Sequence, residues 1–237
     1  ALSSLTIVAT FWIGRELFDS ATGLIAALAY AGSTLVALIS HRVLVDPVLP
    51  LFWVLEALFV YRSFRGNPSS YLLAGVFTGL AVLTKFTSLI LVPAVLAIYL
   101  LRELEQGGYL GSAWRMLQDR GLYVFFGGFL AVLLPYLGWS YVSYGNPFHT
   151  FHMALRLSGA ADPFYTYILN SHTYLLLVFY AGLIWLPRKW EEWQGTGYYL
   201  PAVFTLSLLL PLQFLVVNRE PRFLTPVIPF LSVLSAA

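Results

Sequence analysis

A succession of apolar runs, separated by short breaks rich in charged residues, glycine or proline, constrains this sequence more than any other feature. The runs lie near residues 1–14, 21–40, 48–63, 70–84, 86–102, 122–143, 172–187, 198–216 and 223–237. A helix needs about 20 mostly apolar residues to cross a bilayer, where its backbone must satisfy its own hydrogen bonds. The pattern therefore predicts an all-α, polytopic transmembrane helical bundle in which residues 1–237 form a single transmembrane domain.

The break at Lys85 allows two arrangements of the surrounding chain. The run 70–84 is short for a crossing, so 70–102 forms either a re-entrant pair or two tilted helices that meet at Lys85. Of these two arrangements, we favour two helices.

The composition indicates that lipid is the main solvent of this chain and that the bilayer is its partner. Hydrophobic residues make up 59% of the chain and charged residues only 10%, whereas about a quarter of the residues in soluble domains are charged. The net charge of +2, with no long basic run, argues against a nucleic-acid partner. The sequence contains no cysteine, which excludes disulfides and thiol catalysis.

Both ends of the sequence lie inside apolar runs. We therefore expect a portion of a longer membrane protein, for which partner membrane subunits are conceivable.

Alternating crossings divide the thirteen Lys and Arg residues between the two sides of the membrane. One side holds Arg15, Arg62, Arg65, Arg102, Arg115, Arg120, Arg188 and Lys189, and the other holds Arg42, Lys85, Arg156, Arg219 and Arg222. Because cytoplasmic loops carry the excess of cations, the first group is predicted to be cytoplasmic. The segment 103–121 is then cytoplasmic, whereas 144–171 is external and could lie along the interface as an amphipathic roof over a cavity.

Asp46 is the candidate catalytic residue. It directly precedes Pro47 and a predicted span, so one interpretation is a helix N-cap followed by a proline in the first turn. The other is a carboxylate at the external membrane surface that assists proton transfer, contacts a sugar hydroxyl or binds a metal ion. Arg42, four residues earlier, is a candidate substrate-binding residue, although an ion pair with Asp46 is its simpler role.

Lys85 and Arg222 are candidate phosphate-binding residues. Both lie beside apolar runs on the side that disfavours cations. Lys85 could snorkel to the headgroups, or its ammonium could bind the phosphate of a membrane-level ligand. Arg222 could contact a phosphate in a bidentate manner, whereas the neighbouring Arg219 and Glu220 are simpler to interpret as a solvated pair.

Two further polar features remain. His149 and His152 have a spacing that places them on one face of a helix. With Asp46 they are the weak candidates for a divalent metal site, the one cofactor considered, against an interpretation as interfacial polar residues. Glu56 falls inside an apolar run, and we expect it to face another helix and to be hydrogen-bonded or protonated.

Four segments in this order resemble the dolichyl-phosphate-mannose protein mannosyltransferase superfamily, which includes the bacterial lipid A aminoarabinose transferase. They are FDSATGLIAALAYAGSTLVALISHRVLVDPVLPLFWVLEALFVYR, YLLAGVFTGLAVLTKFTSLILVPAVLAIYLL, YGNPF and PRFLTPVIPF. The resemblance implies a C-type glycosyltransferase fold. It also implies transfer of a sugar from a polyprenyl-phosphate donor to an acceptor at the extracytoplasmic face, by inversion at the anomeric carbon.

The resemblance also implies roles for individual residues. Asp46 matches the family's second loop acid, Lys85 its lysine-containing segment, and Arg222 the basic residue of its R-[YF]-L-x-P segment. The family's first acid, the expected base, would precede Ala1. Two rival functions stay open: a non-catalytic transmembrane subunit of a larger complex, and a transporter or flippase, which internal symmetry or broken helices would favour. The expected location is the plasma or inner membrane, or the endoplasmic reticulum in a eukaryote, with the sugar and acceptor unidentified.

Overall fold

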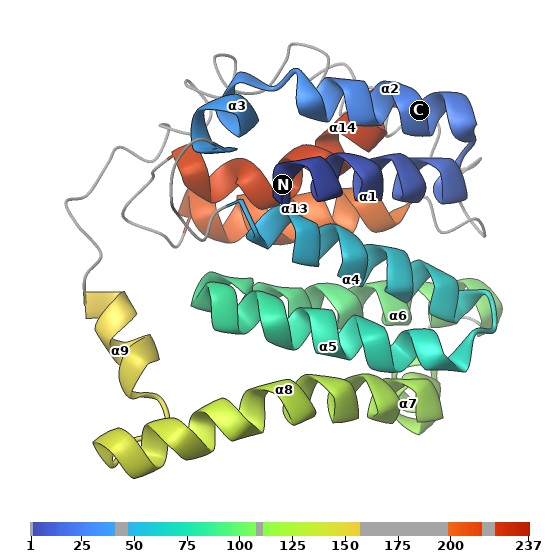
Figure 1. Ribbon diagram of the computed structural model, residues 1–237. Helices are drawn as coiled ribbons and strands as arrows, with labels where there is room; N and C mark the ends of the chain where they lie inside the picture. Colours follow the sequence, from blue (N-terminus) through green and yellow to red (C-terminus); the bar gives the residue numbers. More distant parts are fainter. Residues whose placement is uncertain (1, 41–46, 108–110, 157–198, 215–220) are drawn as a thin grey trace.

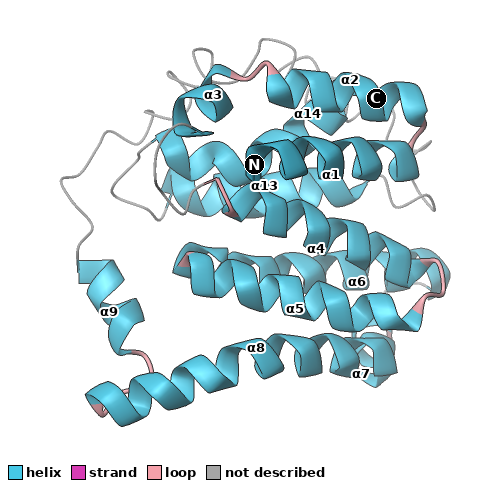
Figure 2. Cartoon of the chain, viewed as in Figure 1, coloured by secondary structure: helices cyan, strands magenta, loops and turns pink. Residues whose placement is uncertain are grey.

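The computed structural model describes residues 2–40, 47–107, 111–156, 199–214 and 221–237, whose regular structure is helical, with no strand among them. The α-helices are α1 (Leu2–Leu17), α2 (Ser20–Ala31), α3 (Thr34–Ser40), α4 (Leu49–Phe64), α5 (Pro68–Thr84), α6 (Leu91–Gly107), α7 (Ser112–Gln118), α8 (Arg120–Tyr144), α9 (His149–Arg156), α13 (Tyr199–Phe214) and α14 (Ile228–Ala236). Two 3-10 helices, η1 (Phe86–Ile90) and η3 (Pro221–Val227), precede α6 and α14. The all-α prediction is confirmed (Figure 2).

The long helices stack side by side in a bundle (Figure 1). From one edge of the bundle to the other, α8 packs on α5, α5 on α4, α4 on α1, and α1 on α2. The last two helices pack on each other, α13 also on α6 and α14 also on α2. Successive long helices from α1 to α8 run in opposite directions, so their ends gather at two ends of the bundle. One end, at the right of Figure 1, holds the α1–α2 and α4–α5 connections, the end of α6 and the α7–α8 connection. The other end holds the start of α4 and the α5–η1 and α8–α9 connections.

Aromatic side chains from α4, α13 and α14 fill the centre of the core. Trp53, Phe204 and Phe230 are each fully buried. The Phe204 ring lies edge-on to Trp53, with 6.3 Å between centroids, and stacks on Phe230 at 5.0 Å. Such pairs add attraction beyond the burial of apolar area, so the last helix of the chain is fixed against α4.

Glycines set the distance between α5 and α8. A Cβ atom at Gly75 would lie 1.9 Å from the backbone oxygen of Phe125, and one at Gly128 would lie 2.4 Å from that of Leu72. Small residues at such contacts let two membrane helices approach closely. The pair therefore packs backbone against backbone.

Two helices are long and apolar enough to cross a membrane among the described residues, Phe86–Leu104 and Arg120–Tyr144, and the pair α2–α3 would make a third. Described helices occupy the predicted runs except 172–187, which lies outside the described residues. The run 21–40 is broken, since α2 and α3 meet at an angle of 59°. Gly32 ends α2, where its N–H donates to the Leu28 carbonyl.

Lys85 forms the second break. α5 ends at Thr84, Lys85 adopts an extended conformation with φ −154° and ψ 119°, and η1 begins at Phe86. Two helical segments thus meet at Lys85. Both breaks interrupt apolar runs at local turns that contain no proline.

Candidate functional site

Arginines gather at the end of the bundle on the right of Figure 1. Arg15 and Arg62 lie in the last turns of α1 and α4, and Arg120 begins α8. The Arg62 Nε donates to Glu16 Oε1 at 3.0 Å, which joins α4 to α1. The six described cations that the sequence assigned to one side do share this end.

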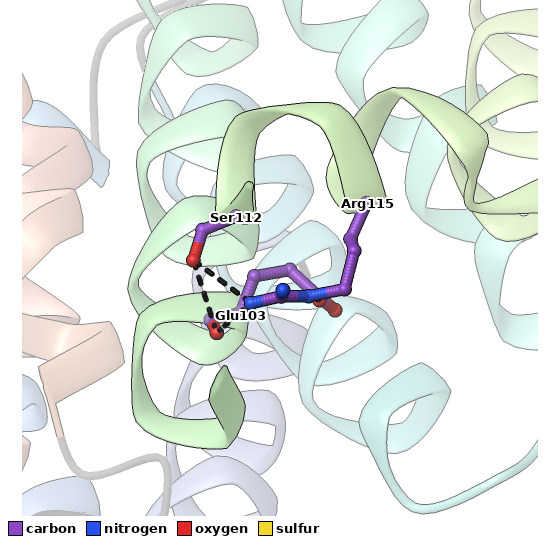
Figure 3. Close-up of polar contacts among 3 residues, drawn as sticks. All are labelled: Glu103, Ser112 and Arg115. Atoms are coloured by element: carbon purple, nitrogen blue, oxygen red, sulfur yellow. Dashed lines mark hydrogen bonds and ion pairs between the residues drawn. The ribbon is translucent and has the colours of Figure 1, made fainter. Parts of the chain in front are cut away.

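The connection between α6 and α7 shows how this end is tied together (Figure 3). The Arg115 Nη2 donates to the Ser112 hydroxyl at 3.0 Å and to the backbone oxygen of Glu103 at 3.2 Å, while its Nε donates to Glu103 Oε2 at 3.2 Å. Arg62 and Arg115 thus join neighbouring helices at this end and have structural partners within the bundle.

The opposite end brings Lys85 and Arg222 together around one aromatic ring. The Lys85 Nζ lies 4.0 Å from the centroid of the Phe223 ring, and the Arg222 Cζ lies 5.8 Å from the same centroid. The two cations are therefore no farther apart than the sum of these distances. Both side chains are half-buried. These two cations, contributed by the α5–η1 junction and by η3, form a candidate anion site at this end of the bundle.

Local structure fixes Lys85 on its side of the ring. Its N–H donates to the Ala81 carbonyl at 2.9 Å, and its own carbonyl accepts from the Ser88 N–H at 2.9 Å. The Ser88 hydroxyl in turn accepts from the Trp53 indole N–H at 3.1 Å. The break at Lys85 is thus hydrogen-bonded, through Ser88, to the buried centre of α4.

The η3 segment presents Arg222 and Phe223 from the other side. Its sequence, PRFLTPV, has a proline at the start and another at Pro226, and both have a fixed φ. The Thr225 hydroxyl donates to the Arg222 carbonyl at 2.8 Å. These restraints hold η3 in one turn. Sequence analysis did not single out Phe223, although an aromatic residue directly after Arg222 was the available signal.

Asp46 and Arg42 lie outside the described residues. Ser40 and Pro47, the described residues on either side, line a small crevice with Tyr30 and with Thr225 of η3. α4 begins at Leu49 with Val48 as its N-cap and a proline in its first turn. The interpretation of Asp46 as the N-cap is therefore wrong, because Pro50 rather than Pro47 occupies the first turn.

His149 and His152 lie on α9, which docks at the same end. The Phe151 ring lies 4.7 Å from that of Phe86, the neighbour of Lys85. The His149 ring stacks on Tyr144 at 4.5 Å, and His152 is exposed. No group of three His, Cys, Asp or Glu suited to a metal ion occurs among the described residues.

Glu56 is fully buried at the α4–α5 contact. Its Oε1 lies 2.8 Å from the Thr78 hydroxyl, which lies 2.9 Å from the Ala74 carbonyl. The prediction that Glu56 faces another helix and is hydrogen-bonded is confirmed. The Thr78 hydroxyl has one proton, so it can donate either to the Glu56 carboxylate or to the Ala74 carbonyl. Both contacts are hydrogen bonds if the Glu56 carboxyl group is protonated and donates to the Thr78 oxygen.

Comparisons with known proteins agree with this fold. The sequence profile of the dolichyl-phosphate-mannose-protein mannosyltransferase family matches residues 1–139. No curated protein sequence matches closely enough to serve as a relative. The structure is similar to the crystal structure of ArnT from Cupriavidus metallidurans bound to undecaprenyl phosphate, with a TM-score of 0.70 and 18% identity. The match covers 99% of this chain and 44% of that one, so this chain spans less than half its length.

Proposed function

Because this chain belongs to the dolichyl-phosphate-mannose-protein mannosyltransferase family, we propose that it forms part of a membrane glycosyltransferase with a polyprenyl-phosphate-linked sugar as its donor. The family and the C-type glycosyltransferase fold make it an integral membrane protein. Several crossings, and an active site at the extracytoplasmic face of the plasma, inner or endoplasmic reticulum membrane, are part of the proposal.

The pairing of Lys85 and Arg222 on Phe223 carries this proposal. Cations at membrane depth are costly and mark functional sites. A phosphate joined to a lipid chain presents its charge at that depth, and ammonium and guanidinium groups are its usual partners. The bound undecaprenyl phosphate of the similar ArnT structure supports the same class of ligand.

The reaction follows from the chemistry of such a donor. An acceptor nucleophile attacks the anomeric carbon from the face opposite the phosphate, and the bond between that carbon and the phosphate oxygen breaks. Its electron pair goes to the phosphate, where Lys85 and Arg222 stabilise the growing negative charge. Asp46 takes the acceptor's proton or orients the sugar. No step is assigned to a metal ion.

Substitution of the two cations tests the proposal in the full-length protein. Lys85→Gln and Arg222→Gln should each weaken polyprenyl phosphate binding about 10- to 100-fold, the value of one hydrogen bond to a charged group. Thermal stability should change little. Arg65→Gln is the control, since Arg65 is exposed and stacks on Tyr61 at the opposite end. Binding that is unchanged in both variants, or equally weakened by the control, would contradict the proposal.

The breaks at α2–α3 and at Lys85 favour a second candidate, a transporter or flippase for the same lipid-linked sugar. Proteoliposomes distinguish the two functions. A glycosyltransferase releases polyprenyl phosphate and a glycosylated acceptor, whereas a flippase moves the intact donor between leaflets without cleaving it.

A further inference from the structure

The outward face of α8 is an uncharged apolar strip. α8 lies at one edge of the bundle and packs on α5 through its inward face (Figure 1). No charged residue occurs between Arg120 and the end of α8. Along the outward face, exposed residues recur at helical intervals: Val124, Gly127, Leu130, Ala131, Leu134 and Gly138. A continuous apolar surface of this kind marks the contact site of an apolar partner.

Exposed aromatic residues mark both ends of this strip. Tyr123 lies at one end, and Trp139, Tyr141 and Tyr144 lie at the other. Tyr141 follows Tyr123 by 18 residues, which corresponds to about 27 Å along the helix axis. The hydrocarbon core of a bilayer is about 30 Å thick, and tyrosine and tryptophan collect at its two interfaces with water. The spacing and the residue types therefore fit lipid as the partner.

The charge at the Tyr123 end is complementary to that of lipid headgroups. Arg15, Arg65 and Arg120 are exposed at this end of the bundle. Anionic headgroups attract arginine side chains that lie near the membrane surface. The Tyr123 hydroxyl donates to the Leu117 carbonyl at 2.7 Å, which ties α7 to the start of α8. A bilayer thus accounts for the apolar strip, for its aromatic ends and for the cations beyond one of them.

The packing of α5 on α8 gives the depth of Lys85 relative to this strip. The two helices run in the same direction, and Gly79 of α5 lies against Val132 of α8. Lys85 follows Gly79 by six residues, and Gly138, the neighbour of Trp139, follows Val132 by six. Because both helices rise by about 1.5 Å per residue, Lys85 lies level with the Trp139 end of the strip.

Ring contacts connect the same end of α8 to Lys85 independently. The Tyr136 ring of α8 lies 5.9 Å from the Phe151 ring of α9, measured between centroids. The Phe151 ring lies 4.7 Å from that of Phe86, which directly follows Lys85. Phe148 of α9 lies 6.4 Å from Phe151 and is exposed. These rings form one group at the level of the candidate anion site.

We propose that the outward face of α8 lies in lipid, and that the two interfaces of the bilayer cross this helix near Tyr123 and Tyr141. The candidate anion site then lies at the depth of the lipid headgroups, where the phosphate of a lipid is also held. This inference goes beyond the proposed function, since it concerns the bilayer and holds whatever ligand the two cations bind.

Nitroxide labels on single cysteines test the inference in the full-length protein, freed of any other cysteine and reconstituted into phospholipid vesicles. The labelled positions are Tyr123, Gly127, Ala131, Leu134 and Tyr141. A Cβ at Gly127 meets nothing within 4 Å, so a label there has room. Electron paramagnetic resonance measures collisions of each label with oxygen, which concentrates in hydrocarbon, and with a water-soluble nickel chelate.

The ratio of oxygen collisions to nickel collisions should be highest at Ala131, which lies near the midpoint between Tyr123 and Tyr141. It should exceed the ratio at either tyrosine position by at least about 10-fold, because a polar complex partitions poorly into hydrocarbon. Leu133→Cys is the matched control, since Leu133 is buried on the inward face, and its label should collide rarely with both reagents. Gln118→Cys, exposed on α7, should collide often with the nickel chelate.

The other possible partners of this face give different results. If another protein helix covered it, labels at Gly127 and Ala131 would collide rarely with both reagents, as at Leu133. If it lined an aqueous cavity, they would collide with the nickel chelate as often as the Gln118 label. Either result would overturn the inference, and so would a maximum displaced from Ala131 by more than about 5 Å, one helical turn.

Discussion

A methyl group added at Gly75 should force α5 and α8 apart. The Cβ of Gly75→Ala would lie 1.9 Å from the Phe125 backbone oxygen and 2.9 Å from the Phe129 backbone nitrogen. Ordinary contacts of this kind begin near 3.4 Å, so the helix backbones must separate by more than 1 Å locally. No flexible side chain can move aside to relieve the clash.

The expected loss of stability follows from this geometry. Overpacking of a well-packed contact lowers the free energy of unfolding by about 1–3 kcal/mol, and a clash against backbone belongs at the upper end of this range. Alanine favours the helix over glycine by up to about 1 kcal/mol, which offsets part of this loss. The free energy of unfolding should therefore fall by about 2 kcal/mol. Gly127→Ala is the matched control, since a Cβ at Gly127 in α8 meets nothing within 4 Å.

Denaturation of the purified full-length protein in detergent, followed by tryptophan fluorescence, measures this difference. Gly127→Ala should be neutral or slightly stabilising. Gly128→Ala should behave like Gly75→Ala, because its Cβ would meet the Leu72 backbone at 2.4 Å. The double variant should lose less than the sum, since one separation of α5 from α8 relieves both clashes. Equal stability of Gly75→Ala and Gly127→Ala would refute the reasoning.

Three further predictions concern polar residues. Asp46→Asn should leave expression and thermal stability nearly unchanged but reduce sugar transfer from a radiolabelled polyprenyl-phosphate donor by about 100-fold or more; wild-type transfer would exclude a role for its charge. Thr78→Val should cost about 1–3 kcal/mol because the buried carboxyl group of Glu56 loses its partner. Most of that loss should return in Glu56→Met/Thr78→Val, and a double-mutant cycle that gives strict additivity would contradict the pairing. Gln118→Cys, an exposed position of the 103–121 segment in a sequence without cysteine, should react with an impermeant reagent only after the membrane is opened; labelling in intact cells would reverse the topology.

Acidic pH should weaken the start of α2. The Thr22 backbone and side-chain hydrogen bonds hold the pKa of Asp19, the N-cap of α2, below its usual value. A carboxylate with a lowered pKa stabilises the fold at neutral pH, and this contribution is lost as the pH falls through that pKa. Asp19→Asn caps without titrating, so melting curves of this variant should lack that part of the acid dependence.

Local sequence patterns predicted much of the architecture and the identity of the candidate cations. The apolar runs are long, and in a bilayer an apolar run has only one regular structure that satisfies its backbone, the helix. Lys85 and Arg222 could be recognised because cations on the disfavoured side of a membrane chain are uncommon. Glu56 could be assigned a partner on another helix because a carboxylate that faces lipid is costly.

The sequence did not predict where individual helices begin and end, because the pattern of apolar residues does not mark these positions. The sequence did not reveal that 21–40 bends by 59° at Gly32 or that α4 begins at Leu49. Prolines at both Pro47 and Pro50 fit the first turn of a helix. Only packing of α4 against its neighbours decided between them.

The sequence by itself determined that this chain is helical, lies in lipid, and has its described cations grouped at two ends. These properties follow from transfer of each residue between water and lipid, which is nearly independent of the partners that the residue meets. The tertiary structure alone decided that Phe223 lies against Lys85 and that Gly75 meets the Phe125 backbone. Such contacts join segments far apart in the chain, and they depend on the register and separation of whole helices, which the sum of many weak packing interactions sets.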